Sequence, residues 1–455
     1  MEYLRRKNIA ILGLGIEGKD LANFLLKQKA RVTIYDSKEE KNIDFKGIDK
    51  KKIKFIGGKN YLSEGLTDFD KVFRSPGVYR YLPEIVEAEK KGVKISSAIK
   101  LFFDLCPAKI IGITGTKGKG TTSTLIYKIL KQSGRDVYLA GNIGKPYLEL
   151  LPKLTNSSWV VLELSSFQLI DLHKSPQISV VLNITIDHMD WHKSRKEYLN
   201  AKKNIVSHQN KSDFAVLNYD YSSSRDFINN TNAKIYYFSK TEKVRGCFVS
   251  NGKIIITSGQ KIEEIGNTDK LLLRGKHNWE NVTASICASS LASAKIQAIK
   301  KVVFSFRGLE HRLELVGRIR GISFYNDSFS TNPQTTEAAI NSYDEPITII
   351  IGGFDKGLRY EGLAKNIADK KNVKTIILIG DIAQKIKRAL KTAKFEGVIK
   401  ELGKKSMKTI VKESYKNTPY GGVVLLSPAT SSFDMFENYK ERGNEFKKAV
   451  VSLRK

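Results

Sequence analysis

The sequence is poor in cysteine and contains no long hydrophobic run. Its three cysteines, Cys106, Cys247 and Cys287, are far apart and form no CxxC pair, which argues against a disulfide scaffold and a structural zinc site. No apolar run approaches the roughly 20 residues needed to cross a bilayer, so we expect no membrane insertion. Glycines break the apolar stretch near the N-terminus, and no small-residue cleavage site follows it. We therefore expect a cytoplasmic protein without a signal peptide.

Acidic residues are also scarce. The chain has 77 Lys and Arg against 47 Asp and Glu, which gives a net charge of +30. Such an excess is compatible with nucleic-acid binding. However, only 18 of the 77 basic residues are Arg, and the lysines are spread along the whole chain rather than gathered with aromatic residues in one segment. We therefore favour a lysine-rich surface and no nucleic-acid partner, and a polyanionic small substrate such as a nucleotide also suits this charge.

What is present is a globular composition at multidomain length. Hydrophobic residues are 41% and charged residues 27% of 455 residues. At roughly 150 residues per domain, this length predicts about three domains. We predict an α/β protein with an N-terminal Rossmann-like domain (1–100), a central P-loop ATPase-like domain with a mostly parallel sheet (101–306) and a C-terminal Rossmann-like domain (307–455).

The first 36 residues have the pattern of a βαβ unit. Strands are predicted at 7–15 and 32–35, with a helix at 19–28 between them. Glycines 13, 15 and 18 have the G-x-G-x-x-G spacing of a dinucleotide-binding turn, and Asp36 follows about twenty residues on, where a ribose-binding carboxylate lies in such folds. A tight turn with nothing bound is the alternative. Residues 74–77 indicate another loop at a strand end.

A phosphate-binding loop is predicted in the second domain. A strand at 110–113 precedes residues 114–122, Thr-Gly-Thr-Lys-Gly-Lys-Gly-Thr-Thr, which open a helix. In this order, backbone N–H groups and the helix N-terminus can bind phosphate oxygens, and Lys119 can neutralise them. The usual spacing is broken because Ile113 holds the first glycine position and Gly120 replaces the hydroxyl residue that touches Mg²⁺. Thr121 is the expected substitute.

The rest of the chain alternates strand and helix patterns, which predicts mostly parallel sheets. Residues 248–257 have the pattern of a hairpin around Asn251-Gly252. Further strands are predicted at 159–162, 178–182, 215–217, 347–351, 375–379 and 423–426, and helices at 277–294, 361–369, 382–393 and 406–416.

Two neighbouring strand ends of the central domain carry possible metal ligands. Glu163 ends one predicted strand, and Asp187 and His188 follow the next one, within residues 183–192. A carboxylate at the end of a parallel strand near a phosphate loop is well placed to hold Mg²⁺. A lone histidine is more often structural, but a histidine in such an acidic cluster is favoured as a site residue.

Several other segments are candidates for binding. Asn278 and Asn281 lie three apart on one helical face and could read an adenine edge, unless Asn278 only caps the helix start. Lys202 lies on a predicted helix, where lysines are usually solvated. The third domain carries polar strings at residues 326–332 and 351–357. A last string, residues 427–436, starts at a strand end and leads into a helix, so its hydroxyl and N–H groups could bind a carboxylate.

Taken together, these motifs resemble the Mur ligases of peptidoglycan synthesis over the whole chain. The resemblance rests on residues 114–122, 163–169, 187–190, 277–278, 311–312, 326–328 and 427–443. The strings at 163–169 and at the C-terminus are most similar to the branch that adds D-glutamate, and the Asp-Asn-Pro-Arg string of the diamino-acid branch is absent. The resemblance implies a monomeric cytoplasmic ligase that uses ATP to join UDP-N-acetylmuramoyl-L-alanine to D-glutamate through an acyl phosphate.

The resemblance also implies roles for individual residues. Two Mg²⁺ ions would be held by Glu163, His188, an N-carbamylated Lys202 and Thr121, and Lys119, Glu163, His188 and Lys202 would form the catalytic set. ATP would contact Gly115, Thr116, Lys117, Gly118, Lys119, Gly120, Thr121, Asn278, Asn281, Arg312 and Asp327. The other two substrates would contact Gly15, Asp36, Ser37, Gly77, Asn142, His188, Thr331, Lys356, Ser432, Phe433 and Tyr439.

The chain departs from the family pattern at two further positions. Phe329 stands where relatives often have a lysine, and Glu17 places a negative charge beside the expected diphosphate loop. Another Mur-type or folylpolyglutamate-type ligase is the closest alternative function. A nucleotide-binding regulatory module and an NAD-dependent dehydrogenase are more distant ones, and the second phosphate loop argues against the dehydrogenase.

Overall fold

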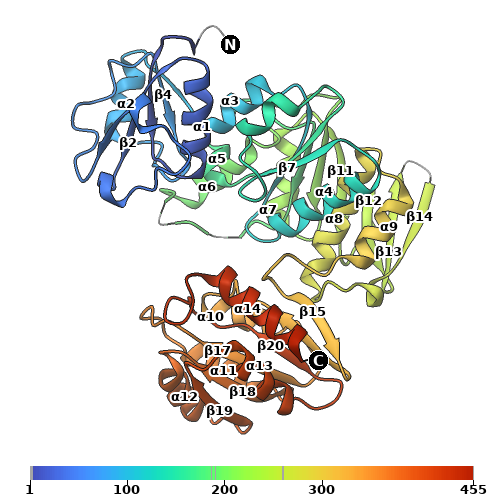
Figure 1. Ribbon diagram of the computed structural model, residues 1–455. Helices are drawn as coiled ribbons and strands as arrows, with labels where there is room; N and C mark the ends of the chain where they lie inside the picture. The colour runs from blue at the N-terminus through green and yellow to red at the C-terminus, as the bar shows by residue number, and fades with distance from the viewer. Residues whose placement is uncertain (1–3, 186, 190, 259–260, 454–455) are drawn as a thin grey trace. The chain divides into compact units, whose positions relative to one another are not determined.

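The computed structural model describes residues 4–185, 187–189, 191–258 and 261–453. The chain forms two compact units. The first comprises Met1–Thr268 and Glu280–Val303, and the second comprises Asp269–Trp279 and Phe304–Lys455. Each is built on α/β layers, and the prediction of an α/β protein with mostly parallel sheets is confirmed (Figure 1). Among the described residues, no helix is long and apolar enough to cross a membrane.

The N-terminal sheet has five parallel strands in the order β3-β2-β1-β4-β5. This order reverses direction between β1 and β4, and open parallel sheets bind ligands at the carboxyl ends of the strands at such a point. The strands are β1 (Asn8–Leu12), β2 (Arg31–Asp36), β3 (Ile53–Gly57), β4 (Lys71–Arg74) and β5 (Lys94–Ser96), and the helices are α1 (Ile16–Lys27), α2 (Pro83–Lys90) and α3 (Ala98–Leu105).

The central sheet has nine strands in the order β14-β13-β12-β11-β10-β9-β6-β8-β7. It is parallel from β7 to β12, and β12, β13 and β14 continue it as antiparallel strands. The strands are β6 (Lys109–Thr114), β7 (Val137–Gly141), β8 (Trp159–Glu163), β9 (Ile178–Val181), β10 (Phe214–Asn218), β11 (Lys234–Ser239), β12 (Gly246–Ser250), β13 (Lys253–Ser258) and β14 (Lys261–Asn267). The helices are α4 (Lys119–Gln132), α5 (Ser166–Leu169), α6 (Arg195–Lys203), α7 (Ser222–Arg225), α8 (His277–Leu291) and α9 (Ile296–Ser305).

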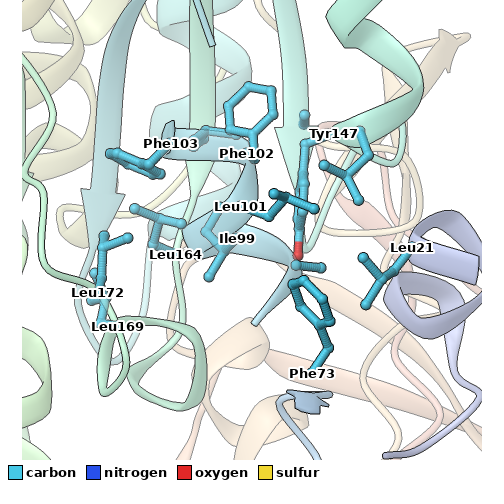
Figure 2. Close-up of a cluster of buried hydrophobic side chains, with 14 of the residues drawn as sticks. Leu21, Phe73, Ile99, Leu101, Phe102, Phe103, Tyr147, Leu164, Leu169 and Leu172 are labelled. Carbon is cyan, nitrogen blue, oxygen red and sulfur yellow. The ribbon is translucent and has the colours of Figure 1, made fainter. Parts of the chain in front are cut away.

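One hydrophobic cluster joins the first two sheets of the first unit. Leu21 and Phe73 come from the N-terminal sheet and its helix, and Leu164 follows β8 of the central sheet. Figure 2 shows these side chains together with Phe102 of α3. Because α3 is buried along most of its length, it packs as a shared element between the two sheets.

The six-stranded sheet of the second unit has the order β15-β16-β20-β17-β18-β19, and only β15–β16 is antiparallel. Ile349 and Ile351 of β17 join one hydrophobic cluster, and Ile350 joins another, so both faces of the sheet are covered. The strands are β15 (Glu314–Ile319), β16 (Ile322–Asn326), β17 (Ile347–Gly352), β18 (Val373–Ile379), β19 (Val398–Gly403) and β20 (Val423–Leu426), and the helices are α10 (Pro333–Ile340), α11 (Glu361–Asp369), α12 (Ala383–Thr392), α13 (Met407–Lys416) and α14 (Tyr439–Ser452).

The structure moves the boundaries of some predicted elements. The first strand ends at Leu12 rather than at residue 15, and the following helix starts at Ile16 rather than at residue 19. The reason is Gly13, whose φ of 87° ends the strand in a conformation that favours glycine. The helix predicted at 277–294 ends at Leu291. The hairpin around Asn251-Gly252 is confirmed, with both residues at positive φ.

Candidate functional site

A cleft of about 390 Å³ lies at the carboxyl ends of β1, β2 and β4. It brings together four residues that were predicted to bind substrate, namely Gly15, Asp36, Ser37 and Gly77. Its position is the point where the strand order reverses, which is where an open parallel sheet binds its ligand.

Asp36 organises the glycine turn of this cleft. One carboxylate oxygen accepts from the Leu14 N–H at 2.8 Å, and the other accepts from the Lys38 N–H at 2.9 Å. Gly18 lies so close to the turn that a Cβ there would stand 2.2 Å from the Gly13 carbonyl oxygen. The glycine spacing therefore lets the first turn of α1 approach the strand end, where its N–H groups can face an anion.

The Glu17 carboxylate lies among uncharged partners rather than against phosphate. It accepts hydrogen bonds from the Tyr147 hydroxyl and, at 2.6 Å, from Gln168 Nε2. Burial raises the pKa of Glu17, and the two hydrogen bonds oppose that rise. This arrangement explains how an acidic residue is accommodated at the end of a diphosphate-type turn: its side chain ties α1 to α5 and to Tyr147.

The opposite wall of the cleft is also tied to the central sheet. Arg74 is buried and donates to three carbonyl oxygens of the loop that follows β4, those of Ser75, Pro76 and Val78. The same guanidinium contacts the Asp171 carboxylate at 2.6 and 3.0 Å. Sequence reasoning assigned no role to Arg74, because its partner lies 97 residues away.

The predicted phosphate loop connects β6 to α4. Gly115 and Gly118 have φ values of 150° and 86°, and a Cβ on Gly118 would stand 2.2 Å from Asn281 Oδ1. Lys119 Nζ donates to the Gly115 and Thr116 carbonyl oxygens at 3.0 Å each, so the lysine lies over its own loop. Gly120 and Thr121 lie in the first turn of α4, and Lys117 is exposed.

Lys202 is not a solvated helix lysine. It is 2% exposed, and its Nζ donates to Gly115 O at 3.0 Å and to Thr114 Oγ1 at 3.3 Å, at the start of the phosphate loop. Burial lowers the pKa of Lys202 well below its ordinary value, and the Lys119 ammonium adds to this, while Asp187 and Glu163 oppose it. The structure thus brings together Lys202, Lys119 and the candidate metal ligand Glu163.

The two predicted strand ends lie beside this loop. Glu163 ends β8 and is 8% exposed, and the Asn142 N–H donates to its carbonyl oxygen at 3.3 Å. His188 has a φ of 55°, and its Nε2 is 3.5 Å from the Asp187 carboxylate. Ile186 and Asp190 of the same string lie outside the described residues.

The donor set fits Mg²⁺ better than a metal held by protein alone. Among the described residues, no three His, Cys, Asp or Glu side chains form a group that could hold a metal ion. Mg²⁺ commonly takes one or two carboxylates and completes its shell with water and substrate phosphate oxygens. Glu163 supplies one such carboxylate. The Asn183 side-chain oxygen, Oδ1, is buried without a hydrogen-bond partner among the described residues. The backbone carbonyl of the same residue accepts from the Thr116 N–H of the phosphate loop.

Asp327 is the centre of a buried network in the second unit. It accepts from Ser427 Oγ at 2.8 Å, from the Leu313 N–H at 3.2 Å and from the Ser330 hydroxyl. Burial raises the pKa of Asp327 to about 7, and the two hydroxyl bonds oppose the rise. The Arg312 guanidinium lies 3.8 Å from the centroid of the Phe329 ring, so the unexpected phenylalanine provides a face for this arginine.

The other predicted residues of the second unit are spread over several loops. Lys356 Nζ donates to the Thr331 carbonyl at 3.4 Å, and the exposed Phe433 ring meets Phe354 edge-on at 6.1 Å. Ser432 is buried, and its Oγ has no hydrogen-bond partner within the described part of the chain.

Three more residues of the second unit lie at helices α8 and α14. Tyr439 begins α14, and Asn278, the second residue of α8, donates its amide to the Arg274 carbonyl at 2.5 Å. The buried Arg442 donates to Ser328 O at 2.9 Å and to Thr430 O at 3.1 Å. Arg442 stood in a string that supported the resemblance, but nothing in the string gave it a role.

Three family models match the chain in succession. They are the Mur ligase MurD-like N-terminal domain at residues 7–97, the Mur ligase middle domain at 113–289 and the Mur ligase glutamate ligase domain at 311–430. The phosphate loop, Glu163 and Lys202 all fall within the middle-domain match.

Curated relatives are similar over the full length. The UDP-N-acetylmuramoylalanine–D-glutamate ligase of Acetivibrio thermocellus is 40% identical over 460 residues, which cover 99% of this chain and 97% of that protein. The protein of the same name from Symbiobacterium thermophilum is 38% identical over 453 residues, with 98% of both chains covered.

Solved structures share the fold at low identity. The UDP-N-acetylmuramate-alanine ligase of Thermotoga maritima superposes with a TM-score of 0.58 at 18% identity, covering 98% of this chain and 100% of that one. A UDP-N-acetylmuramoyl-L-alanyl-D-glutamate–2,6-diaminopimelate ligase gives a TM-score of 0.60 at 17% identity, covering 98% and 92%.

Proposed function

The chain belongs to the Mur ligase family, and from this premise we propose that it joins D-glutamate to UDP-N-acetylmuramoyl-L-alanine at the expense of ATP. The curated relatives that align with nearly the whole chain have this activity in their names. The reaction belongs to the synthesis of peptidoglycan precursors. Because ATP and nucleotide-linked sugars are cytoplasmic metabolites, we assign the enzyme to the cytoplasm.

The observation that carries this function is the grouping of Lys119, Lys202 and Glu163 around one phosphate loop. Lys119 at the start of α4 suits the phosphates of a nucleoside triphosphate, and Glu163 together with a modified Lys202 suits the magnesium that accompanies it. A dehydrogenase needs no second phosphate loop of this kind, so the glycine turn of residues 13–18 is better assigned to the uridine diphosphate of the acceptor.

We assign the three ligands to three domains, at 1–100, 101–306 and 307–455. The cleft lined by Gly15, Asp36, Ser37 and Gly77 takes the uridine diphosphate part of the acceptor, and Asn142 and His188 contact its muramoyl end. ATP contacts Gly115, Thr116, Lys117, Gly118, Lys119, Gly120, Thr121, Asn278, Asn281, Arg312 and Asp327, and D-glutamate contacts Thr331, Lys356, Ser432, Phe433 and Tyr439.

The reaction has two steps. The L-alanine carboxylate of the acceptor attacks the γ-phosphorus of ATP, and ADP leaves with the electrons of the broken P–O bond. The resulting acyl phosphate is attacked by the amine of D-glutamate, which loses a proton, and the tetrahedral intermediate collapses to the amide and inorganic phosphate. Lys119 offsets negative charge on the transferred phosphoryl group. Glu163, His188 and Thr121 would hold Mg²⁺, which would offset negative charge on the phosphate oxygens.

We further propose that Lys202 is N-carbamylated and serves as a ligand of a second Mg²⁺. The bare ammonium is almost fully buried beside Lys119, which is costly for a charged group. Addition of CO₂ to the neutral amine gives a carbamate and one released proton. The carbamate is anionic and offers hard oxygen atoms of the kind that Mg²⁺ prefers.

The function is tested by measuring ADP release with each substrate omitted in turn. We expect turnover only with ATP, UDP-N-acetylmuramoyl-L-alanine and an amino acid together, and a large preference for D-glutamate over L-glutamate. Faster turnover with L-lysine or diaminopimelate would show that the amine has been assigned wrongly. ADP release without any acceptor would overturn the assignment of ligase activity.

A further inference from the structure

A single buried histidine connects the segments that carry the proposed metal ligands. His192 is 3% exposed, and both of its ring nitrogens have partners. Its Nε2 lies 2.9 Å from Ser166 Oγ, and its Nδ1 lies 3.1 Å from Glu197 Oε1. Neither the family resemblance nor the proposed reaction assigns a role to His192, Ser166 or Glu197.

The partners of His192 lie close in sequence to the metal-site residues. Ser166 begins α5 and is the third residue after Glu163. Glu197 lies in the first turn of α6, five residues before Lys202. His192 itself follows His188 by four residues. The imidazole therefore links the three segments that supply the proposed ligands.

Aromatic packing holds the imidazole in one orientation. The Phe167 ring stacks on His192 with centroids 5.7 Å apart and an interplanar angle of 16°, and it also meets the His188 ring at 4.8 Å. The Tyr198 ring meets His192 edge-on at 5.3 Å, and its hydroxyl lies 2.9 Å from Thr116 Oγ1 of the phosphate loop. The ring is thus fixed both by its hydrogen bonds and by its neighbours.

The hydrogen-bond partners determine the tautomer. A carboxylate can only accept, so the Nδ1 atom facing Glu197 carries the hydrogen. In the neutral imidazole, the Nε2 atom is then the acceptor and receives the hydroxyl hydrogen of Ser166. A neutral imidazole in this state bridges a carboxylate on α6 and a hydroxyl on α5 without adding positive charge.

We propose that His192 is a positioning residue of the magnesium centre, holding α6 and the segment after β8 at the separation that their proposed Mg²⁺ ligands, Lys202 and Glu163, need. The inference rests on the proposed function, because it assumes that these two residues are ligands. Outer residues that orient metal ligands are typically worth about 10–100-fold in metal affinity. A buried histidine that only fills the core would affect stability alone.

The test compares metal binding with stability in three variants. The His192→Gln variant retains a polar atom near Ser166, His192→Asn retains one near Glu197, and His192→Leu retains neither. Mn²⁺ binding is measured by electron paramagnetic resonance in the presence of a non-hydrolysable ATP analogue, and melting temperature is measured on the same samples. We expect His192→Leu to weaken Mn²⁺ binding by about 10-fold or more, with His192→Gln and His192→Asn in between.

A matched control removes another buried hydrogen-bonded side chain of the same unit. Gln209 is 3% exposed, and its amide donates to Pro176 O at 3.0 Å and Phe214 O at 2.9 Å. Gln209→Leu should lower the melting temperature and leave Mn²⁺ binding unchanged.

The decision does not depend on His192→Leu being folded. An unchanged Mn²⁺ dissociation constant in both His192→Gln and His192→Asn, with a lower melting temperature, would overturn the positioning role while leaving the proposed function intact. Failure of the wild-type protein to bind Mn²⁺ with the ATP analogue would instead overturn the proposed metal site, and this inference with it.

Discussion

Replacing Asp171 by Ala should destabilise the first unit strongly. The Asp171 carboxylate accepts from Arg74 at 2.6 and 3.0 Å and lies 3.0 Å from Arg80 Nε. The Arg74 side chain is fully buried, so the substitution leaves a charged group without its counterion. Removing one partner of a buried ion pair costs about 3–5 kcal/mol. We expect the free energy of unfolding to fall by about 3 kcal/mol, the lower end of this range, because four backbone carbonyls still accept from Arg74.

The same substitution should also affect the acceptor cleft. Arg74 holds the loop of residues 75–78, which forms one wall of that cleft. We therefore expect a higher KM for the UDP-linked acceptor and little change in the KM for ATP. Urea denaturation followed by tryptophan fluorescence measures the stability, since the Trp191 ring lies 5.7 Å from the Arg74 guanidinium.

The control is Glu87→Ala, which removes an exposed pair with Lys91. Exposed pairs of this kind contribute little, so no measurable loss is expected. Equal urea midpoints for Asp171→Ala and Glu87→Ala would refute the reasoning, because the buried pair would then be worth no more than an exposed one.

Four further substitutions, one of them a control, test the nucleotide site and the second unit. Lys119→Ala should lower kcat by about 10²–10³ or more with unchanged circular dichroism, and wild-type turnover at saturating ATP would mean that the ATP site is misplaced. Lys202→Ala should be nearly inactive and partly restored by acetate, whereas Lys203→Ala should be nearly normal; full activity of Lys202→Ala would exclude the carbamate. Between pH 4 and 7 the folded protein keeps a proton on Asp327 that the unfolded chain loses, since burial raises its pKa from 3.8 to about 7. The free energy of unfolding should therefore fall with rising pH over that window by on the order of 4 kcal/mol, and Asp327→Asn should flatten the urea-midpoint profile; an identical profile would contradict a buried neutral carboxyl.

Local patterns in the sequence predicted most of the sheet strands and the phosphate loop. The reason is that strand alternation, glycine turns and helix starts are determined by residues close together in the chain. Gly13 and Gly118 are examples, since each adopts a positive φ at a turn between a strand and a helix. The edge strand β14 was not predicted, because its sequence, Lys-Ile-Glu-Glu-Ile-Gly-Asn, is charged and gives a weak strand signal.

Contacts between distant segments could not be predicted in the same way. Glu17 meets Tyr147 and Gln168, which are 130 and 151 residues away. No local pattern distinguishes such a glutamate from a solvated one, so its side chain was expected to conflict with a bound diphosphate. Lys202 had the same difficulty: composition favours an exposed lysine, and only the family resemblance indicated a special role before its burial was known.

In the proposed function, ATP activates the carboxylate of the acceptor before D-glutamate is added. The most direct measurement uses UDP-N-acetylmuramoyl-L-alanine labelled with ¹⁸O in the alanine carboxylate, together with ATP and D-glutamate. In the proposed reaction, one carboxylate oxygen becomes the bridging oxygen of the acyl phosphate and leaves with phosphorus. We predict that mass spectrometry will find one ¹⁸O atom in each inorganic phosphate released and the other in the amide carbonyl of the D-glutamate product. Unlabelled phosphate alongside that product would contradict an acyl phosphate and the mechanism built on it.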